Sequence, residues 1–472
     1  MTTTRLPLVE ELSSSLTVMD AVRCLAHWPR LLLLESALQR EPVGRFSFLM
    51  ADPINHWTLA VPCYGTDPLA VLRSVSEQWA EESQSDLPPF QGGVAGLLGY
   101  ELGQSWERVA TSGHDEFQLP VMAVGLYDCV IAWDHQTNRV WLISQGWPES
   151  DLLARTDRAA RRIRSVKQSL DANLVERPPF LCNQLPEIAP QFSLASHPQV
   201  TSSFSRENYL RTVERVIEYI DAGDIFQANL SQRLLTRAIS APSELYGRLR
   251  MVNPAPFAGL MQWEDWSIVS ASPERFLSVT NGEIETRPIK GTRQRKRGPE
   301  ADLFTRDELR QSEKDRAENV MIVDLLRNDL SRVCLPGTVR VPQLCAVESY
   351  ETVQHLVSEV RGHLDPQYTI WDLFRATFPG GSISGAPKVR AMQIIAELEP
   401  TVRGPYCGSL FYVGADGKSD SNLLIRSFVQ RYGWLQCHVG GGIVAQSNPE
   451  AEYEETLTKA AGMLRALTKN ES

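Results

Sequence analysis

The chain has 472 residues, enough for one large domain or for two to three domains of ordinary size. Its 57 acidic and 47 basic side chains give a net charge of −10, which argues against nucleic acid as a partner. The composition, 43% hydrophobic and 22% charged, is that of a globular protein, and no apolar run approaches the roughly 20 residues of a membrane span.

The eight cysteines are scattered along the chain, without a Cys-x-x-Cys pair or a regular spacing. Reduced thiols in a cytoplasmic protein are the simplest explanation. The amino terminus lacks the charged segment, apolar core and small-residue cleavage site of a secretion signal. We therefore expect neither secretion nor insertion into a membrane.

Strand patterns dominate an N-terminal region, residues 1–170. The aliphatic run 31–34 predicts a buried strand, and the alternating segments 121–133 and 140–144 predict antiparallel strands. A helix is expected to follow over 149–170. A stretch rich in Pro, Ser, Asn and Gln then predicts a long connector, whose bounds are 171–205.

The C-terminal region, residues 206–468, mixes helices and strands. Its pattern predicts a helix over 206–222 and strands over 267–280 and 283–286, with Asn281-Gly282 as a hairpin turn between the strands. Because strands and helices do not alternate regularly, the sequence favours an α+β fold with antiparallel sheets over a doubly wound parallel fold.

Lys290 lies in the segment Arg-Pro-Ile-Lys-Gly-Thr-Arg. A lysine titrates near ~10.4, so the free amine that attacks carbon is scarce at neutral pH unless the surroundings lower the pKa. Nearby like charges destabilise the ammonium form, which makes Lys290 a candidate nucleophile. The neighbouring cations are Arg287, Arg293, Arg295, Lys296 and Arg297. A solvated basic turn is the alternative interpretation.

One helix is predicted to carry a carboxylate on its buried face. Over residues 318–333, Glu318 extends a stripe formed by Ile322, Leu325, Leu326, Leu330 and Val333. A buried carboxylate needs a cation, a metal or a hydrogen-bond donor. The alternative is that Glu318 lies exposed in the first turn, where it complements the helix dipole.

A second helix is predicted to begin at Pro449, with Asn448 as its cap. Glu452, Glu455 and Lys459 are spaced to project from one face, which places two oxygen ligands and one cation in a column. Magnesium prefers such hard oxygen ligands and bridges them to anionic substrates. An ordinary glutamate-rich helix start is the alternative.

Two glycine-rich segments, residues 379–388 and 440–442, can bring backbone amides close to an anion. Neither is a nucleotide-binding motif. The first fails as a phosphate-binding P-loop because Ala386, not lysine, follows Gly385. The sequence therefore does not support ATP or NAD as a ligand.

As a set, these segments resemble the chorismate-utilising enzymes, over roughly residues 204–467. The family's fold implies two packed antiparallel β-sheets surrounded by helices. The segments that carry the resemblance are 224–231, 272–276, the Lys290 segment, 318–330, the glycine-rich loop from 380, and 440–455. The first 170 residues match more loosely, through Leu33-Leu34-Glu35-Ser36.

Within the family, the resemblance is to the branch that aminates chorismate to 4-amino-4-deoxychorismate, on the route to p-aminobenzoate and folate. It implies that Lys290 attacks C2 of chorismate and expels the C4 hydroxyl, with Glu274 as the general acid or base. Anthranilate synthases usually carry alanine in place of this lysine. This difference favours the aminating branch. Anthranilate synthase component I is the nearest alternative activity, and a non-catalytic anion or nucleic-acid binder built on residues 287–297 is a remote one.

The same resemblance assigns the remaining site residues. It implies magnesium as the cofactor, held by Glu318, Glu452 and Glu455, and substrate carboxylates held by Tyr406, Arg426, Gly440 and Lys459, with His355 near the ring. Gln227 stands where related enzymes place a water-activating lysine, which favours ammonia as the nucleophile. Taken singly, each of these residues also has an ordinary structural explanation, and only their joint occurrence predicts a site.

Two further ligands follow from the resemblance. The sequence has no Gly-x-Cys-x-Gly motif for a glutaminase, so a separate glutamine amidotransferase subunit is expected to supply ammonia. Leu34, Glu35 and Ser36 match the tryptophan-holding element of anthranilate synthase relatives, which makes tryptophan a candidate ligand.

Overall fold

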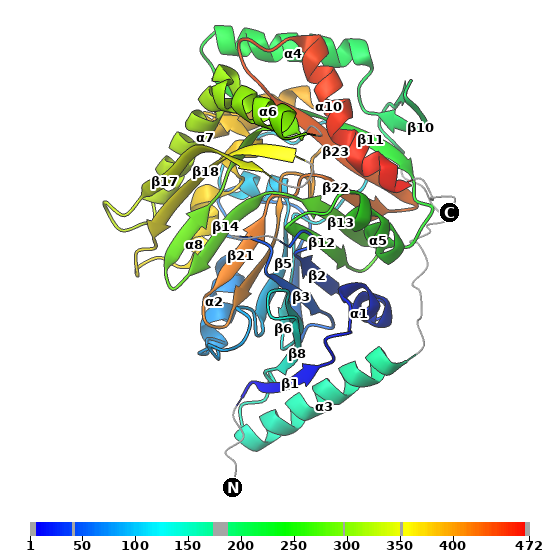
Figure 1. Ribbon diagram of the computed structural model, residues 1–472, viewed down its shortest axis with the longest axis vertical. Coiled ribbons are helices and arrows are strands. Elements are labelled where there is room, and N and C mark those ends of the chain that lie inside the picture. Colours follow the sequence, from blue (N-terminus) through cyan, green and yellow to red (C-terminus); the bar gives the residue numbers. More distant parts are fainter. Residues whose placement is uncertain (1–5, 40–42, 173–186, 296–297, 350–352, 468–472) are drawn as a thin grey trace.

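The computed structural model describes residues 6–39, 43–172, 187–295, 298–349 and 353–467. It contains two large antiparallel β-sheets packed face to face, with helices over their outer faces (Figure 1). The expected α+β architecture is therefore confirmed.

The larger sheet has thirteen strands. In order across the sheet they are β1 (Leu8–Leu12), β8 (Arg139–Ser144), β7 (Cys129–Asp134), β3 (Phe46–Met50), β2 (Leu31–Glu35), β12 (Phe257–Gln262), β13 (Trp266–Ser272), β22 (Ser427–Arg431), β23 (Trp434–Ile443), β11 (Gln227–Arg237), β10 (His197–Ser202) and β9 (Phe192–Leu194), with β19 (Gly385–Ala386) paired to β11.

The smaller sheet has ten strands. They are β16 (Ile289–Gln294), β18 (Val353–His363), β15 (Glu283–Thr286), β14 (Arg275–Thr280), β21 (Ser419–Asn422), β20 (Ser409–Gly414), β5 (Gly93–Leu98), β6 (Met122–Tyr127) and β4 (Asn55–Leu59), with β17 (Arg340–Ser349) paired to β18.

Helices cover the outer faces of both sheets. They are α1 (Val18–Leu25), α2 (Ala70–Gln78), α3 (Leu152–Asp171), α4 (Arg206–Asp221), α5 (Pro242–Val252), α6 (Pro299–Gln311), α7 (Glu313–Ser331), α8 (Ile370–Thr377), α9 (Lys388–Leu398) and α10 (Pro449–Leu464), with short 3-10 helices η1 (Tyr100–Ser105), η2 (Gly381–Ile383) and η3 (Arg465–Leu467).

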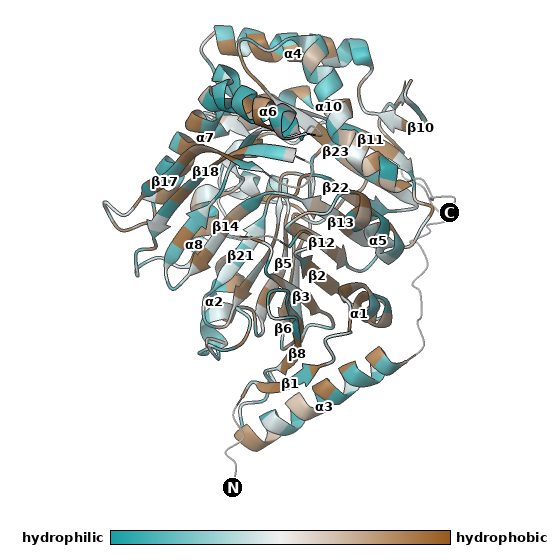
Figure 2. Cartoon of the chain, in the orientation of Figure 1, coloured by the Kyte–Doolittle hydropathy of each residue, from teal (hydrophilic) through white to brown (hydrophobic). Residues whose placement is uncertain are grey.

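Apolar side chains bury both faces of the larger sheet, as the brown central strands in Figure 2 show. On β2, Leu32 packs between the sheets, whereas Leu31 and Leu33 pack against the helices of the outer face. A strand buried on both faces has no polar side to present to water. This explains why residues 31–34 form a continuous aliphatic run.

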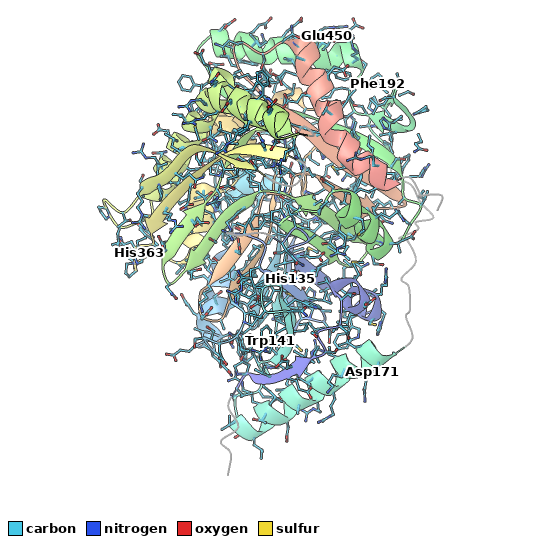
Figure 3. The ribbon with its side chains drawn as sticks, in the orientation of Figure 1. His135, Trp141, Asp171, Phe192, His363 and Glu450 are labelled. Carbon is cyan, nitrogen blue, oxygen red and sulfur yellow. The ribbon has the colours of Figure 1, made fainter. Side chains whose placement is uncertain are left out.

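Strands from both halves of the sequence are interleaved in each sheet. In the larger sheet β2 pairs with β12, and in the smaller sheet β5 pairs with β20. The expected connector begins at Asp171, the last residue of α3 (Figure 3), and its later part contains β9 and β10. The division into residues 1–170, 171–205 and 206–468 stays a prediction.

Most local predictions match observed elements, with two corrections that bear on the site. Asn281 and Gly282 both adopt positive φ, as a tight hairpin turn requires, and join β14 to β15. The strand expected over 267–280 is wrong as a single element. Pro273, which has no N–H to donate, lies between β13 and β14, so that Glu274 stands where the chain passes from one sheet to the other.

The second correction concerns the start of α7. Ser312 caps this helix by accepting a hydrogen bond from the Asp315 amide, so the helix begins at Glu313 and not at Glu318. Glu318 is therefore in the second turn, partly buried, and is not an exposed first-turn residue. No helix in the described part of the chain is long and apolar enough to cross a membrane, and the cysteines described there are free.

Candidate active site

Apart from Tyr406 and the residues expected to hold tryptophan, the predicted site residues converge where the two sheets meet α7, α10 and the glycine-rich loop. β16 of the smaller sheet carries Lys290, and the adjoining strands β11 and β23 of the larger sheet carry Gln227 and Gly440. Residues 385–386 pair with the start of β11, with Gln227 opposite Ala386. This pairing fixes the glycine-rich loop between the sheets.

Lys290 and Glu274 contact the same residue of that loop. Lys290 Nζ donates to the carbonyl oxygen of Ser382 at 3.1 Å, and the Ser382 hydroxyl donates to Glu274 Oε1 at 3.0 Å. These two side chains, sixteen positions apart in sequence, are thus held on either side of one serine. Ser382 lies in a loop that the sequence marks as glycine-rich, but its role as a bridge has no sequence signal.

Burial changes the protonation of both groups. It lowers the pKa of Lys290 below its usual value, an effect that Lys459 reinforces and that Glu318, Glu274 and Glu455 oppose. Burial raises the pKa of Glu274 to about 7, against the effect of Lys290. An amine with a lowered pKa beside a carboxylic acid that retains its proton near neutrality supplies a nucleophile and a proton donor.

The cause expected for the lowered pKa of Lys290 is wrong. The arginines around it are paired with acids, which cancel much of their charge, so burial and not the basic segment has the largest effect. Lys296 and Arg297 lie outside the described residues. The pairs are Arg287–Glu359 at 2.5 Å, Arg293–Asp315 at 2.9 Å and Arg295–Asp302 at 2.6 Å.

The acidic column predicted on α10 faces Gly441. A β-carbon placed on Gly441 would lie 3.2 Å from Glu452 Oε2, 3.6 Å from Glu455 Oε1 and 3.8 Å from Lys459 Nζ. Lys459 donates to the Gly440 carbonyl at 2.9 Å and pairs with Glu455 at 2.7 Å. Glycine is required at this point of β23 because a side chain would occupy the space into which the three groups project.

Glu452 is the buried member of the column and is already paired. Its Oε1 accepts from the Ser447 hydroxyl at 2.6 Å and from Lys314 Nζ, on α7, at 3.2 Å. Burial raises the pKa of Glu318, also on α7, with Glu452 adding to the effect while Lys290 and Lys314 oppose it. The two helices therefore present their carboxylates towards one another.

This donor set has the oxygen chemistry that magnesium prefers. Within the described residues, however, no three acidic, histidine or cysteine side chains lie close enough together to form a ligand group. Lys314 lies against Glu452, where its ammonium charge compensates the buried carboxylate. The residues fit a divalent ion by their chemical type, and magnesium itself stays a prediction.

Gln227 is buried at the start of β11, and its Oε1 has no hydrogen-bond partner among the described residues. Gly442 of β23 lies opposite Asn229 of β11, and a side chain placed on Gly442 would overlap the Gln227 amide. The triple glycine thus makes room for Gln227 as well as for the acidic column. An unpaired buried amide oxygen is available to accept a hydrogen bond from a ligand.

Arg426 interacts electrostatically with both Glu274 and His355. Burial lowers the pKa of Arg426, which Glu274 opposes. Burial also lowers the pKa of His355 to about 4, with Arg426 acting in the same direction, so this histidine is neutral at physiological pH. Arg426 therefore brings a positive charge to the side of the site near Glu274, and its neighbour His355 is an uncharged ring.

Tyr406 lies on the far side of β11 from the acidic column. Its ring stacks on His438, with centroids 5.2 Å apart, and Arg403 lies 5.6 Å from its ring centroid. Burial raises the pKa of Tyr406 well above its usual value, while its contact with the Asn229 side chain acts in the opposite direction. The tyrosine therefore stays protonated.

Arg403 and Glu399 form a buried ion pair that the sequence analysis missed. Arg403 donates to Glu399 at 2.6 and 2.9 Å, to the Ile383 carbonyl at 3.1 Å and to the Asn229 carbonyl. Glu399 Oε1 in turn accepts from the backbone amide and hydroxyl of Ser231, at 2.8 and 2.9 Å. The pair joins β11 to the glycine-rich loop. Its i, i+4 spacing is the only sequence signal, and surface pairs share it.

Replacing Glu399 with alanine is expected to lower the free energy of unfolding by roughly 3–5 kcal/mol, because Arg403 would keep a buried charge without its partner. Urea denaturation followed by circular dichroism measures this. The matched control is Glu207→Ala, which removes an i, i+4 pair with Arg211 from the protein surface and is expected to change little. Equal stability losses in both variants would contradict the role given to the buried pair.

Of the three residues expected to hold tryptophan, Glu35 and Ser36 are hydrogen-bonded within the protein, and Leu34 packs against the core between the sheets. The Glu35 carboxylate is buried and accepts from Arg250, at 2.6 and 3.2 Å, and from the Tyr246 hydroxyl. The Ser36 hydroxyl donates to the Phe46 carbonyl at 2.7 Å. A tryptophan ammonium group would have to compete with Arg250 for Glu35, and tryptophan as a ligand stays a prediction.

Comparison with known proteins agrees with this arrangement. Residues 35–465 match the family described as chorismate binding enzyme. The chain is 40% identical over 455 residues to aminodeoxychorismate synthase component 1 of Salmonella typhimurium, covering 93% of this chain and 94% of that protein. It is 41% identical over 391 residues to anthranilate synthase component 1 of Thermus thermophilus, covering 83% of this chain and 80% of that protein.

A solved structure shares the architecture. The crystal structure of anthranilate synthase component I from Streptococcus pneumoniae superposes with a TM-score of 0.74 at 29% identity, covering 90% of this chain and 93% of that chain. The agreement of sequence and fold over nearly the full length shows that this protein belongs to the chorismate-binding enzymes.

Proposed function

We propose that this enzyme aminates chorismate with ammonia to 4-amino-4-deoxychorismate, through a covalent adduct between Lys290 and C2 of the substrate. The observation that carries the proposal is the pair of contacts made by Ser382, which holds the Lys290 amine and the Glu274 carboxyl side by side. A solvated basic turn would give neither the burial of the amine nor the adjacent acid.

The residues divide one substitution into two steps. First, the Lys290 amine forms a bond to C2, the double bonds of the ring shift, and the bond between C4 and its hydroxyl breaks. Glu274 gives the proton with which that hydroxyl leaves as water. Ammonia then forms a bond to C4, the double bonds shift back, and the bond between C2 and Lys290 breaks, which restores the free amine.

Gln227 supports ammonia over water as the second nucleophile. Its amide is neutral and does not remove a proton from water, as a lysine with a lowered pKa does. Its unpartnered Oε1 accepts a hydrogen bond from an N–H of ammonia and orients the nitrogen lone pair. A hydroxylating enzyme would need a base at this position.

The two carboxylates of chorismate need positive charge and hydrogen-bond donors. Arg426, whose charge is only partly offset by Glu274, suits one of them, and Lys459 with the backbone at Gly440 suits the other. Tyr406 and His355 complete the uncharged part of the pocket. A magnesium ion held by Glu318, Glu452 and Glu455 would supply further positive charge against a substrate carboxylate when bound.

Glu452→Gln is expected to raise the magnesium concentration needed for half-maximal activity by about 10-fold or more, because an amide is a weaker ligand than a carboxylate. Titration of chorismate consumption with magnesium chloride measures it. Glu454→Gln, two residues along the same helix and exposed, is the control and should leave the titration unchanged. Identical titrations for both variants would remove Glu452 from the metal site.

The relatives' names support a partner. The similar aminodeoxychorismate and anthranilate synthases are each called component 1, and we propose that this chain likewise works with a glutamine amidotransferase that supplies ammonia. Anthranilate synthase stays the alternative activity, because the Thermus thermophilus relative is as similar in sequence to this chain as the Salmonella typhimurium relative is. Lys290, in place of the alanine usual in anthranilate synthases, favours amination without loss of pyruvate.

Product identification separates the two activities. Purified protein is incubated with chorismate, magnesium and ammonium chloride, and the products are analysed by mass spectrometry and fluorescence. We expect 4-amino-4-deoxychorismate with no pyruvate released. Anthranilate fluorescence with stoichiometric pyruvate, in the absence of any added lyase, would assign the chain to the alternative activity.

A further inference from the structure

The strand that carries Lys290 contains one residue more than the strand it pairs with. Lys290 of β16 lies opposite Leu356 of β18. Thr292, two residues further along, lies opposite His355, which is only one residue from Leu356. Gly291 is therefore the extra residue, and its φ of +73° is the left-handed conformation that glycine adopts at the first position of a G1 β-bulge.

The bulge changes the face on which the side chains that follow it lie. In a regular strand, residues three apart such as Lys290 and Arg293 point to opposite faces of the sheet. Here Lys290 is opposite Leu356 and Arg293 is opposite Gln354, two positions of β18 that share one face. This face is covered by α6, because Leu356 packs against Leu309 of that helix. The extra residue thus turns both cations of β16 towards the helices.

The two cations have acidic counterparts on α7, the next helix along the chain. Arg293 pairs with Asp315 at 2.9 Å. Glu318, three residues further along α7 and on the same side of the helix, is the acid with the strongest effect on the pKa of Lys290. The ion pair of Arg293 therefore fixes the strand to α7 at a point from which Lys290 extends towards the proposed reaction centre.

The helices pack directly on the bulge. A β-carbon placed on Gly291 would lie 2.8 Å from Asp315 Cγ and 2.9 Å from Leu309 Cδ1. Non-bonded atoms do not approach one another so closely, so a side chain at this position would push the strand away from α6 and α7. It would also disfavour the left-handed backbone. Either change would move the Lys290 amine away from the Ser382 carbonyl, to which it donates at 3.1 Å.

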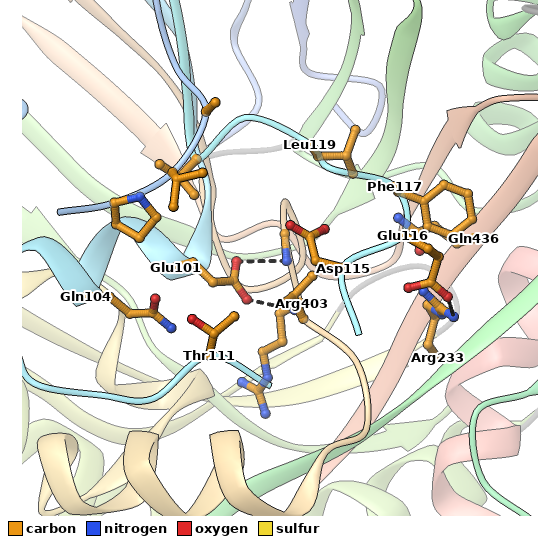
Figure 4. Close-up of a pocket in the computed structure, with 16 residues that line it drawn as sticks. Glu101, Gln104, Thr111, Asp115, Glu116, Phe117, Leu119, Arg233, Arg403 and Gln436 are labelled. Atoms are coloured by element: carbon orange, nitrogen blue, oxygen red, sulfur yellow. Dashed lines mark hydrogen bonds and ion pairs between the residues drawn. The ribbon is translucent and has the colours of Figure 1, made fainter. Parts of the chain in front are cut away.

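A polar cavity near the loop that follows β5 does not offer the substrate another place (Figure 4). Its volume of about 50 Å³ gives room for a few water molecules but not for chorismate. Its cations are already paired, Arg233 with Glu116 at 2.5 Å and Arg403 with Glu399, so they are not free to hold two carboxylates. The substrate is therefore expected beside Lys290, where the direction of the amine decides whether it reaches the ring.

We propose that Gly291 is a positioning residue for the reaction, and that its bulge, held to α7 by the Arg293–Asp315 ion pair, aims the Lys290 amine at the substrate. This inference rests on the proposed function, because it takes Lys290 as the nucleophile. Without the extra residue, a strand that kept Arg293 on α7 would turn Lys290 to the opposite face of the sheet, away from Glu318. The glycine after the lysine therefore has a role in the reaction although it carries no reactive group.

The first test removes the glycine. Gly291→Ala is expected to lower kcat for amination by about 10²-fold or more, because the nucleophile is misplaced, while the KM for chorismate stays within about 3-fold of wild type. Gly282→Ala is the matched control, since Gly282 has a φ of +79° in the β14–β15 turn of the same sheet, and its kcat should stay within about 2-fold. A wild-type kcat in Gly291→Ala, or equal losses in both variants, would overturn the proposal.

The second test loosens the bulge without changing its backbone, and it decides the question if Gly291→Ala does not fold. Arg293→Gln should form the covalent adduct with chorismate about 5-fold more slowly or worse, measured by rapid acid quench and mass spectrometry without ammonia. Arg295→Gln, two residues further along, removes an ion pair with Asp302 and should form the adduct at the wild-type rate. A wild-type rate of adduct formation in Arg293→Gln would overturn the proposal.

The position of the amine can also be measured independently of activity. In a crystal structure of Gly291→Ala, Lys290 Nζ should have lost its hydrogen bond to the Ser382 carbonyl, while the Ser382 hydroxyl still donates to Glu274. An amine that keeps its wild-type position would overturn the proposal. If the wild-type protein neither forms the adduct nor aminates chorismate, the proposed function fails, and this crystal structure still decides separately whether the bulge aims Lys290.

Discussion

Replacing Lys290 with alanine is expected to lower the amination of chorismate by roughly 10³-fold or more, because the covalent step would lose its nucleophile. The rate is measured as 4-amino-4-deoxychorismate formed at saturating chorismate, magnesium and ammonium. The fold should survive, because Lys290 as a whole residue is partly exposed although its amine is buried, and that amine makes one hydrogen bond, to the Ser382 carbonyl. Circular dichroism and thermal unfolding check this.

Two further variants separate a role of Lys290 as nucleophile from a role as positive charge. Lys290→Arg keeps a cation beside Glu274 and Glu318 but removes the free amine, and should be as inactive as the alanine variant. Lys418→Ala removes a lysine paired with Asp416, away from the site, and should retain full activity. Wild-type rates in the arginine variant would show that Lys290 acts as a charge and does not bond to the substrate.

Glu274→Gln is expected to lower kcat by roughly 10²–10⁴-fold, the usual contribution of a general acid. The pH profile carries the more specific expectation. Because the pKa of Glu274 is raised to about 7, the acid form predominates below that pH and is lost above it. The value of kcat/KM for chorismate should therefore fall as pH rises through about 7 in the wild type, and this limb should be absent in the glutamine variant.

The conservative change keeps the local structure. Glutamine retains an oxygen that can accept a hydrogen bond from the Ser382 hydroxyl. The contact between Ser382 and Lys290 is therefore expected to be preserved. Glu285→Gln, in a partly buried network with Arg275 and Arg361, is a suitable control for loss of a carboxylate elsewhere in the same sheet. An unchanged pH profile in Glu274→Gln would mean that another group donates the proton.

Features set by neighbouring residues were predictable from the sequence. The cap Asn448 and the first residue Pro449 place the start of α10 correctly, and helix geometry then puts Glu452, Glu455 and Lys459 together over Gly441. The hairpin at residues 281–282 follows from the need for positive φ at both positions. In each case the physical cause lies within a few residues of its effect.

Features that depend on distant segments were not predictable in the same way. The charge state of Lys290 depends on burial between elements far apart in sequence, and its partner Ser382 lies 92 positions away. The basic segment looks strongly cationic in isolation, but acids on α6, α7 and β18 pair with its arginines. The burial of the Arg403–Glu399 pair likewise depends on distant segments, because residues of β11 and of the glycine-rich loop enclose it.

Trapping of the covalent intermediate tests the central claim most directly. The protein is mixed with chorismate and magnesium without ammonia, quenched with acid, digested and analysed by mass spectrometry. We expect the peptide that contains Lys290 to gain the mass of chorismate less one water, and the adduct to disappear when ammonium is added before the quench. An unmodified Lys290 peptide, in protein that aminates chorismate at full rate from the same preparation, would contradict the account.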